Sequence, residues 1–259
     1  MLQLGTVDRS DDRPPYKQIA DELRSAIDLG RLAPGEKLPS EADLVEHYKV
    51  SRMTARQAIQ ELRSEGLVDA EQGRGVFVRK VAPIRRLASD RFARRHRQDG
   101  KAAFIIEAEK SGVQPSVDQI RVSRESPSSF IQERLRLTAS DSVVVRARRY
   151  LANDIPVETA VSYIPAEIAD GTAIAELNTG PGGIYARIED AGHILDHFTE
   201  EVSARMPTPE ERKDLQLGAS VPVLRVVRTA YDTTGRPVEV CDTIKAAPAY
   251  LLEYELPAR

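Results

Sequence analysis

The stretch Ser51-Arg-Met-Thr-Ala-Arg-Gln-Ala-Ile-Gln-Glu-Leu-Arg-Ser-Glu-Gly66 decides the fold of the first part of this 259-residue chain. Serine is favoured just before a helix and glycine just after one, so the stretch predicts a helix between its two ends. At about 100° per residue, the apolar side chains of that helix share one arc: Ala55, Ala58, Ile59 and Leu62. The opposite arc is mostly basic and amide-bearing: Arg52, Met53, Arg56, Gln57, Gln60 and Arg63.

Two more helices are predicted upstream. Residues 16–30 repeat apolar side chains at helical spacing and close on Gly30, and Ser40 precedes a second, short helical stretch, residues 41–48, as an N-cap. Only Lys49-Val50 separates residues 41–48 from the helix that follows Ser51. Two short helices joined by a tight turn predict a helix-turn-helix.

A β-hairpin is predicted directly after these helices. Residues 67–79 read as a strand, a tip at Gly73-Arg74-Gly75 and a second strand. The hairpin would bring Arg74 toward a DNA groove or phosphate. Helix-turn-helix plus hairpin is a winged helix, which we place at residues 1–80.

The outer face of the third helix suits the major groove of DNA. An arginine fork pairs with guanine, a glutamine amide pairs with adenine, and a helix N-terminus attracts phosphate. Arg52 and Arg56 lie at the leading end of this helix. A single charged helix face is usually only solvated, but three helices, a tight turn and a Gly-Arg-Gly hairpin in sequence support one another.

Residues 38–41, 51–58, 62, 65–67 and 73–78 resemble the DNA-binding signature of the GntR family. The resemblance implies a repressor-like homodimer on double-stranded operator DNA of near-palindromic sequence. Ala55 stands where the family usually has Val or Thr. The positions that match the family's DNA contacts are Ser40, Glu41, Ser51, Arg52, Thr54, Arg56, Gln57, Gly73, Arg74 and Gly75.

Length and composition indicate a two-domain chain without a membrane segment. Hydrophobic residues make up 41% and charged residues 30%, and no apolar run approaches the roughly 18 residues that a span needs. The N-terminus has no cationic and apolar leader, so a cytoplasmic address is expected. The net charge is −3, and residues 1–80 carry 13 Lys and Arg against 14 Asp and Glu. DNA binding therefore depends on where the cations lie.

Cysteine and histidine usage argues against a metal centre. Cys241 is the only cysteine, which excludes an intramolecular disulfide and a multi-cysteine zinc site. His193 and His197 have helical spacing but lack the glutamate of a metalloprotease motif. No metal and no cofactor are expected.

A basic segment follows the predicted wing. Residues 85–97 hold six arginines and one acid, where a domain boundary is expected. We interpret residues 81–97 as a basic linker. A solvated helix, an extra phosphate-binding element and the lip of an anion pocket stay open as alternatives.

The remaining chain, residues 98–259, repeats itself weakly. Residues 141–158 are echoed by residues 221–239, each an Arg-bearing hairpin preceded by a short charged helix. The turns at Asn153-Asp154 and Thr234-Gly235 carry residues that tolerate tight hairpins. Two such units predict one antiparallel sheet with helices on a face, so the fold class is α+β.

This layout resembles the effector domain (UTRA domain) of the HutC branch of the GntR family, which shares its fold with chorismate lyase. The resemblance implies a small-molecule effector, anionic or hydroxyl-rich. The second of two family arginines falls on Tyr150 and a family serine on Gly183, which puts a phosphorylated sugar in doubt; Arg146 or Arg149 would compensate only in another strand register. The implied effector residues are Arg148, Tyr150, Gly183, Ile184, Tyr185, Glu239 and Tyr250.

The sequence is compatible with three functions. The first is a ligand-responsive transcriptional regulator, most simply a repressor released by its effector. The second is an enzyme, but the sequence offers no nucleophile–base pair or metal constellation, and a shared fold does not carry activity. The third is a constitutive DNA-binding protein whose second domain only dimerises. The first is the function that the sequence favours.

Overall fold

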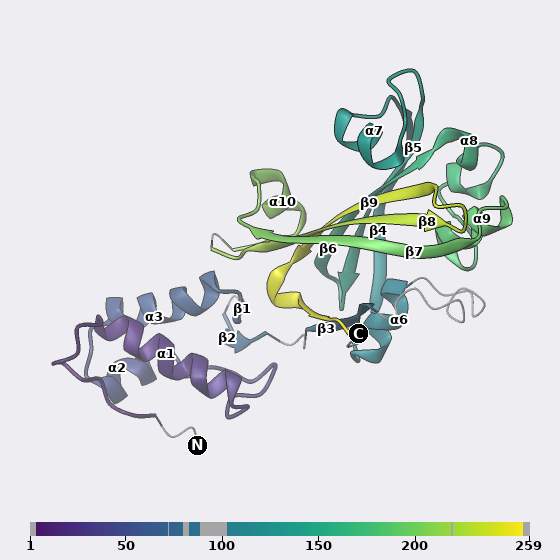
Figure 1. Cartoon of the computed structure of the whole chain (residues 1–259). Coiled ribbons are helices and arrows are strands. Elements are labelled where there is room, and N and C mark those ends of the chain that lie inside the picture. Colours follow the sequence, from purple (N-terminus) through teal and green to yellow (C-terminus); the bar gives the residue numbers. More distant parts are fainter. Residues whose placement is uncertain (1–3, 72, 80–82, 89–102, 219, 256–259) are drawn as a thin grey trace. The chain divides into compact units, whose positions relative to one another are not determined.

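The computed structural model describes residues 4–71, 73–79, 83–88, 103–218 and 220–255 (Figure 1). It divides into two compact units, residues 1–82 with 217–221 and residues 83–216 with 222–259. The predicted linker at 81–97 differs from this division, because residues 84–87 form a strand of the second unit. The rest of the basic segment, residues 89–97, lies outside the described residues.

Three helices form the body of the first unit: α1 (Pro15–Asp28), α2 (Glu41–Tyr48) and α3 (Arg52–Ser64). The apolar arc predicted for α3 is fully buried, and it packs with Leu23 of α1 and Leu44 of α2 in one core. Lys49 ends α2 in the left-handed conformation, at φ 53°, which turns the chain toward α3 within two residues. The helix-turn-helix expected from the sequence is thereby confirmed.

The wing is the antiparallel hairpin of β1 (Val68–Glu71) and β2 (Gly75–Val78). Residues 35–38 run beside β2 of this hairpin, since the amide of Leu38 donates to the carbonyl of Val76 at 2.8 Å. Val68 and Val78 point into the core of the helices. The hairpin is therefore fixed to the helical body on one side and leaves its tip exposed.

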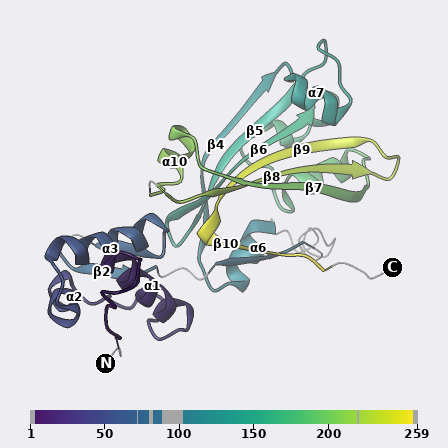
Figure 2. The ribbon, with the colours of Figure 1, turned by 60° about the vertical axis from the view of Figure 1, so that its left-hand side comes forward.

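The second unit is built on a six-stranded antiparallel sheet in the order β4-β5-β6-β9-β8-β7 (Figures 1 and 2). A separate parallel pair joins β3 to β10. The strands are β3 (Ile84–Leu87), β4 (Pro115–Glu125), β5 (Val143–Ala152), β6 (Ile155–Pro165), β7 (Leu195–Arg205), β8 (Val223–Asp232), β9 (Pro237–Ala246) and β10 (Tyr250–Glu253). The helices are α6 (Ala103–Lys110), α7 (Ser129–Leu135), α8 (Ala166–Ala169), η1 (Ala173–Ala175), α9 (Gly183–Asp190), α10 (Pro209–Asp214) and η2 (Ala247–Ala249).

The sheet consists of two similar halves that meet where β6 pairs with β9. The predicted hairpins are confirmed as β5–β6 and β8–β9, with α7 and α10 as the short helices before them. Asn153 and Asp154 both adopt positive φ in the first turn, as the sequence anticipated. Each half also has an outer strand, β4 or β7, and a preceding helix, α6 or α9, that the repeat did not reveal.

Helices cover the two faces of this sheet differently. Residues directly opposite one another on paired strands point to the same face, so the pairing register assigns each side chain to a face. On one face α7 packs on Val143 and Val145. On the other, α8, η1 and α9 pack on Val144 and Ile164. We call this second face the polar face, because its middle carries buried charged side chains.

Candidate DNA interface and effector site

The outer arc of α3 is a continuous exposed surface. Arg52, Arg56 and Gln57 are all exposed, and the side chain of Arg52 keeps 84% of its surface in solvent. Its Nε donates to a carboxylate oxygen of Glu41 at 3.2 Å, so α2 orients the first arginine of α3. The surface therefore presents two arginine forks and one amide from successive turns of a helix.

Two hydroxyls fix the ends of the helix-turn-helix pair. Ser51 Oγ accepts the backbone N–H of Thr54 at 3.1 Å and contacts the Thr54 hydroxyl at 2.9 Å. Ser40 forms a reciprocal capping box with Asp43 at the start of α2. The two hydroxyls thus accept backbone N–H groups of Thr54 and Asp43 and hold the starts of α3 and α2.

The wing tip exposes Arg74 between two glycines with positive φ. Arg74 pairs with Glu71, and 69% of its side chain remains exposed. Gly75 has φ of 125°, and a Cβ added to it would lie 2.6 Å from Cε of Lys37. Lys37, which no sequence pattern marked, is brought to the wing by the isolated bridge to Phe77, from a loop 38 residues earlier than Gly75. No local sequence pattern indicates that approach.

The polar face of the second unit brings most of the predicted effector residues onto one surface. Arg148 lies in β5, part-buried, and donates from Nε to the Tyr150 hydroxyl at 2.6 Å and from Nη2 to Ser162 at 3.0 Å. Its other contact is the carbonyl of Arg146. Within the described part of the chain, the hydrogen-bond partners of Arg148 are all neutral.

Burial and charge act against each other at Arg148. Burial disfavours the cation, yet the surrounding acceptors, with Tyr150 first and Glu239 after it, raise the pKa of this guanidinium above its usual value. Burial lowers the pKa of Arg146, and the charge of Arg148 lowers it further. An arginine remains protonated in proteins, so these two neighbouring cations repel one another. An anion bound beside them would relieve that repulsion.

Neither neighbour of Arg148 serves as a second free arginine. Arg146 points to the same face, but its guanidinium donates to the carbonyls of Ile174 at 2.6 Å and Leu177 at 3.0 Å. Arg149 points to the opposite face and pairs with Asp118 at 2.7 Å. In this register neither Arg146 nor Arg149 replaces the second family arginine, which the sequence analysis expected of them only in another register.

Tyr185 and Glu239 form a second cluster on the same face. The Tyr185 hydroxyl donates to Glu239 at 2.6 Å, and Arg228, which the sequence analysis missed, lies 3.6 Å from the same carboxylate. Burial raises the pKa of Tyr185 well above its ordinary value, Arg228 opposes the change, and Glu239 adds to it. Tyr185 is therefore a neutral hydrogen-bond donor at physiological pH.

Gly183 and Ile184 begin the helix that carries Tyr185. Gly183 is the first residue of α9 and adopts φ of 66°. Ile184 packs against the apolar cluster under α8 and η1. The side chain of Ile184 therefore belongs to the apolar core, and the N–H of Gly183 already donates to the carbonyl of Gly180 at 3.3 Å.

Tyr250 belongs to a third cluster rather than to the Tyr185 group. Its hydroxyl donates to Glu158 at 2.7 Å, and Lys245 pairs with the same carboxylate. Glu158 lies opposite Tyr150 in the strand register. In the same face Arg86 of β3, which is 1% exposed, pairs with Glu200 of β7. These contacts hold β3 and β10 onto the polar face.

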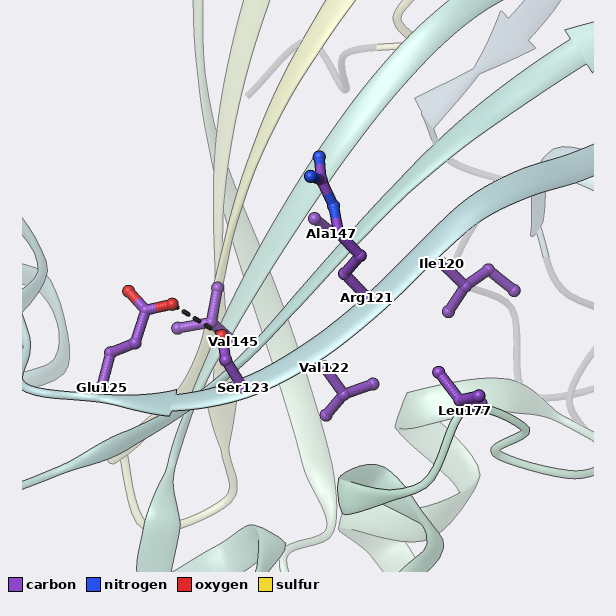
Figure 3. Close-up of a pocket in the computed structure, with 8 residues that line it drawn as sticks. All are labelled: Ile120, Arg121, Val122, Ser123, Glu125, Val145, Ala147 and Leu177. Carbon is purple, nitrogen blue, oxygen red and sulfur yellow. Dashed lines mark hydrogen bonds between the residues drawn. The ribbon is translucent and has the colours of Figure 1, made fainter.

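The edge of the sheet formed by β4 carries a separate, open hollow of about 630 Å³ (Figure 3). It follows β4 and is lined by Ile120, Arg121, Val122, Ser123, Glu125, Val145, Ala147 and Leu177. The only hydrogen bond drawn among them joins Ser123 to Glu125, at 2.6 Å. The polar clusters described above contribute none of its lining.

Two family models match the chain. "Bacterial regulatory proteins, gntR family" matches residues 15–78, and "UTRA domain" matches residues 110–250. An HTH-type transcriptional regulator of Streptomyces coelicolor is 34% identical over 93% of this chain and 92% of its own length. The HTH-type transcriptional repressor NagR of Bacillus subtilis is 30% identical, covering 92% of each chain. The chain belongs to the GntR family.

Solved structures agree with this assignment. A crystal structure of a GntR-family transcriptional regulator, 29% identical, covers 96% of this chain and 99% of its own with a TM-score of 0.60. PhnF from Mycobacterium smegmatis, at 20% identity and a TM-score of 0.60, shares the fold over 93% of this chain. The GntR-family chain is thus a transcriptional regulator with a DNA-binding and an effector domain, and not an enzyme.

The two histidines with helical spacing each have an acidic partner. His193 bonds Asp232 at 2.9 Å, and His197 bonds Asp196 at 2.8 Å and stacks on Tyr231. Across the described ranges, no three His, Cys, Asp or Glu side chains gather as a metal site requires. None of the helices described is long and apolar enough to cross a bilayer.

Proposed function

We propose that this GntR-family regulator binds a near-palindromic operator as a homodimer in the cytoplasm and is released when a small-molecule effector occupies the polar face. The exposed arc of α3 carries the DNA part of the proposal, with Arg52, Arg56 and Gln57 aimed outward from a rigid, capped helix. The wing adds Arg74, and Lys37 adds a further cation beside it. Glu41 acts as the partner that orients Arg52.

The Arg148 cluster carries the effector part of the proposal. A part-buried guanidinium with neutral partners, next to a second cation, is suited to an anionic group. Tyr185 and Glu239 offer a donor and an acceptor for hydroxyl groups of the same ligand. Since Arg148 has no second free arginine beside it, the chemistry favours a carboxylate-bearing or other less charged, hydroxyl-rich metabolite. NagR of Bacillus subtilis and MngR of Escherichia coli are named repressors, which supports repression as the mode of action.

Ligand-induced stabilisation tests the effector site. A panel of sugar acids, sugar phosphates and uncharged sugars is screened against the full chain by thermal unfolding. A true ligand at 100 times its Kd stabilises by about 2.7 kcal/mol. Arg148→Gln should abolish this increment, whereas Arg149→Gln, on the opposite face of the same strand, should retain it.

The same ligand must also change DNA binding. Operator fragments selected from the chain's own upstream region are titrated by fluorescence anisotropy, with and without the stabilising compound. Weaker operator binding in its presence supports release by effector. A ligand that stabilises both Arg148 and Arg149 variants equally would place the effector elsewhere, and one that leaves operator affinity unchanged would contradict the regulatory proposal.

A further inference from the structure

Met53 is an apolar side chain on an otherwise polar surface. It lies in the first turn of α3, and 64% of its surface is exposed. The other exposed residues of α3 are all polar or charged: Arg52, Arg56, Gln57, Gln60 and Arg63. A single exposed apolar residue is ordinary on a protein surface, so any role for Met53 must follow from its place on the helix.

Met53 projects outward from the body of the first unit. Leu62, nine residues later on the same helix, is fully buried in the core that α3 forms with α1 and α2. Nine residues at about 100° each turn the helix through about two and a half turns, so the two side chains leave α3 on opposite sides. Met53 therefore lies at the middle of the exposed surface. Arg52 lies nearer its border, where it bonds Glu41 of α2.

The start of α3 holds Met53 in a fixed position. Ser51 caps the helix through the amide of Thr54, and Ala55 is fully buried in the helical core. Arg56 and Gln57 follow Met53 by three and four residues, so both are its neighbours on the helix surface. When this surface enters a major groove, Met53 faces the floor of the groove beside the bases that Arg56 and Gln57 reach.

The floor of the major groove offers an apolar side chain one kind of partner. The base edges there present hydrogen-bond donors and acceptors, and the C5-methyl group of thymine is the apolar exception. A donor or acceptor covered by Met53 would lose its water without gaining a hydrogen bond, which disfavours binding. Contact with a thymine methyl instead removes apolar surface of both groups from water, which favours binding.

We propose that Met53 contacts the C5-methyl group of one thymine in each half-site of the operator. The inference rests on the proposed function, because it requires α3 to lie in the major groove, and it extends that function by naming one base of the operator. Met53 and Arg56 are about one helical turn apart. The thymine therefore lies next to the base pair whose recognition depends on Arg56.

Replacing thymine by deoxyuridine removes this methyl group and leaves the hydrogen-bonding edge intact. A duplex is first selected from random-sequence DNA by the full chain, and each thymine of its half-sites is then replaced in turn. By fluorescence anisotropy, the replacement at one position per half-site should weaken wild-type binding about four-fold, the equivalent of one buried methyl group.

Variants of the chain assign this effect to Met53. Met53→Ala should bind the thymine and deoxyuridine duplexes equally, and Met53→Leu, which keeps an apolar side chain, should retain most of the difference. Leu29→Ala is the matched control, because Leu29 is the other exposed large apolar residue in the described part of the first unit, and it should retain the full difference. Since Met53 is exposed, Met53→Ala removes no core packing, and an unchanged thermal unfolding midpoint verifies that the variant is folded.

The outcomes separate this inference from the proposed function. A chain that selects no duplex, or whose selected duplex binds Arg56→Ala as well as wild type, would overturn both. A selected half-site without a thymine, or one in which every thymine tolerates deoxyuridine, would overturn the Met53 contact alone. A four-fold loss that persists in Met53→Ala would also overturn it, because the methyl group would then act through DNA shape or another side chain.

Discussion

The hydroxyl of Tyr185 donates a 2.6 Å hydrogen bond to Glu239, across 54 residues of sequence. This contact joins α9 to β9 on the polar face, with Arg228 beside the same carboxylate at 3.6 Å. A buried carboxylate held by a cation and a phenol is a preorganised acceptor. A ligand hydroxyl that donates to Glu239 must therefore displace the Tyr185 hydroxyl from this carboxylate or bind beside it.

Removing the Tyr185 hydroxyl should destabilise the second unit. Hydrogen bonds to charged groups contribute about 1.5–3 kcal/mol, so Tyr185→Phe should lower the free energy of unfolding by about 2 kcal/mol in urea. Tyr254→Phe is the matched control, because Tyr254 is 43% exposed. Equal stability of the two variants would show that the Tyr185–Glu239 bond does not contribute to folding.

The N-cap of α3 should contribute to the free energy of unfolding of the chain. Ser51→Ala removes the acceptor for the Thr54 amide and should cost about 1 kcal/mol. Ser64→Ala, which removes a hydroxyl from the other end of the same helix, should cost less than about 0.5 kcal/mol. Chemical unfolding measures both. A Ser51→Ala variant no less stable than Ser64→Ala would contradict the capping role.

The wing should depend on Gly75. At φ of 125°, an alanine is strained, and its Cβ would force Lys37 to move. Gly75→Ala should therefore loosen the contact between residues 35–38 and β2. Amide hydrogen exchange of Leu38 and Val78 reports this contact, and it should speed up about ten-fold for a loss of about 1.4 kcal/mol. Unchanged exchange at both amides would show that the wing tolerates a side chain there.

Much of this structure could be predicted from the sequence, and the exceptions have a physical cause. The helices α1 to α3 follow from periodicity and caps, since each buries one face against the others. The strands β4 and β7 escaped notice because they are exposed edge strands without an alternating apolar pattern. Lys37 was missed because the wing strand that it approaches is distant in the sequence, and Arg228 was missed because the sequence does not show that it faces Glu239 on the next strand. The effector residues came from resemblance, and Tyr250 proved to contact Glu158 in a separate cluster.

Acid should reveal the contribution of Asp232. Desolvation raises the pKa of its carboxyl, but hydrogen bonds from Thr234, His193 and the Arg236 amide outweigh it and lower that pKa to about 2. A depressed carboxyl pKa stabilises the fold above the unfolded value, near 3.9, and the stabilisation disappears as the pH falls toward 2. Asp232→Asn should therefore lose about 2 kcal/mol at pH 7 relative to wild type, and the difference should shrink between pH 4 and pH 2. A difference that is constant with pH would contradict this origin.

The central claim is that α3 reads operator DNA through its exposed arginines. The most direct measurement is the affinity of the full chain for its operator by fluorescence anisotropy, for wild type, Arg56→Ala and the exposed-arginine control Arg31→Ala. Arg56→Ala should weaken operator binding by about 1–3 kcal/mol and reduce discrimination at one base pair in each half-site, and Arg31→Ala should do neither. Loss of affinity that is equal for both variants, or absent from Arg56→Ala, would contradict the assignment of α3 as the recognition helix.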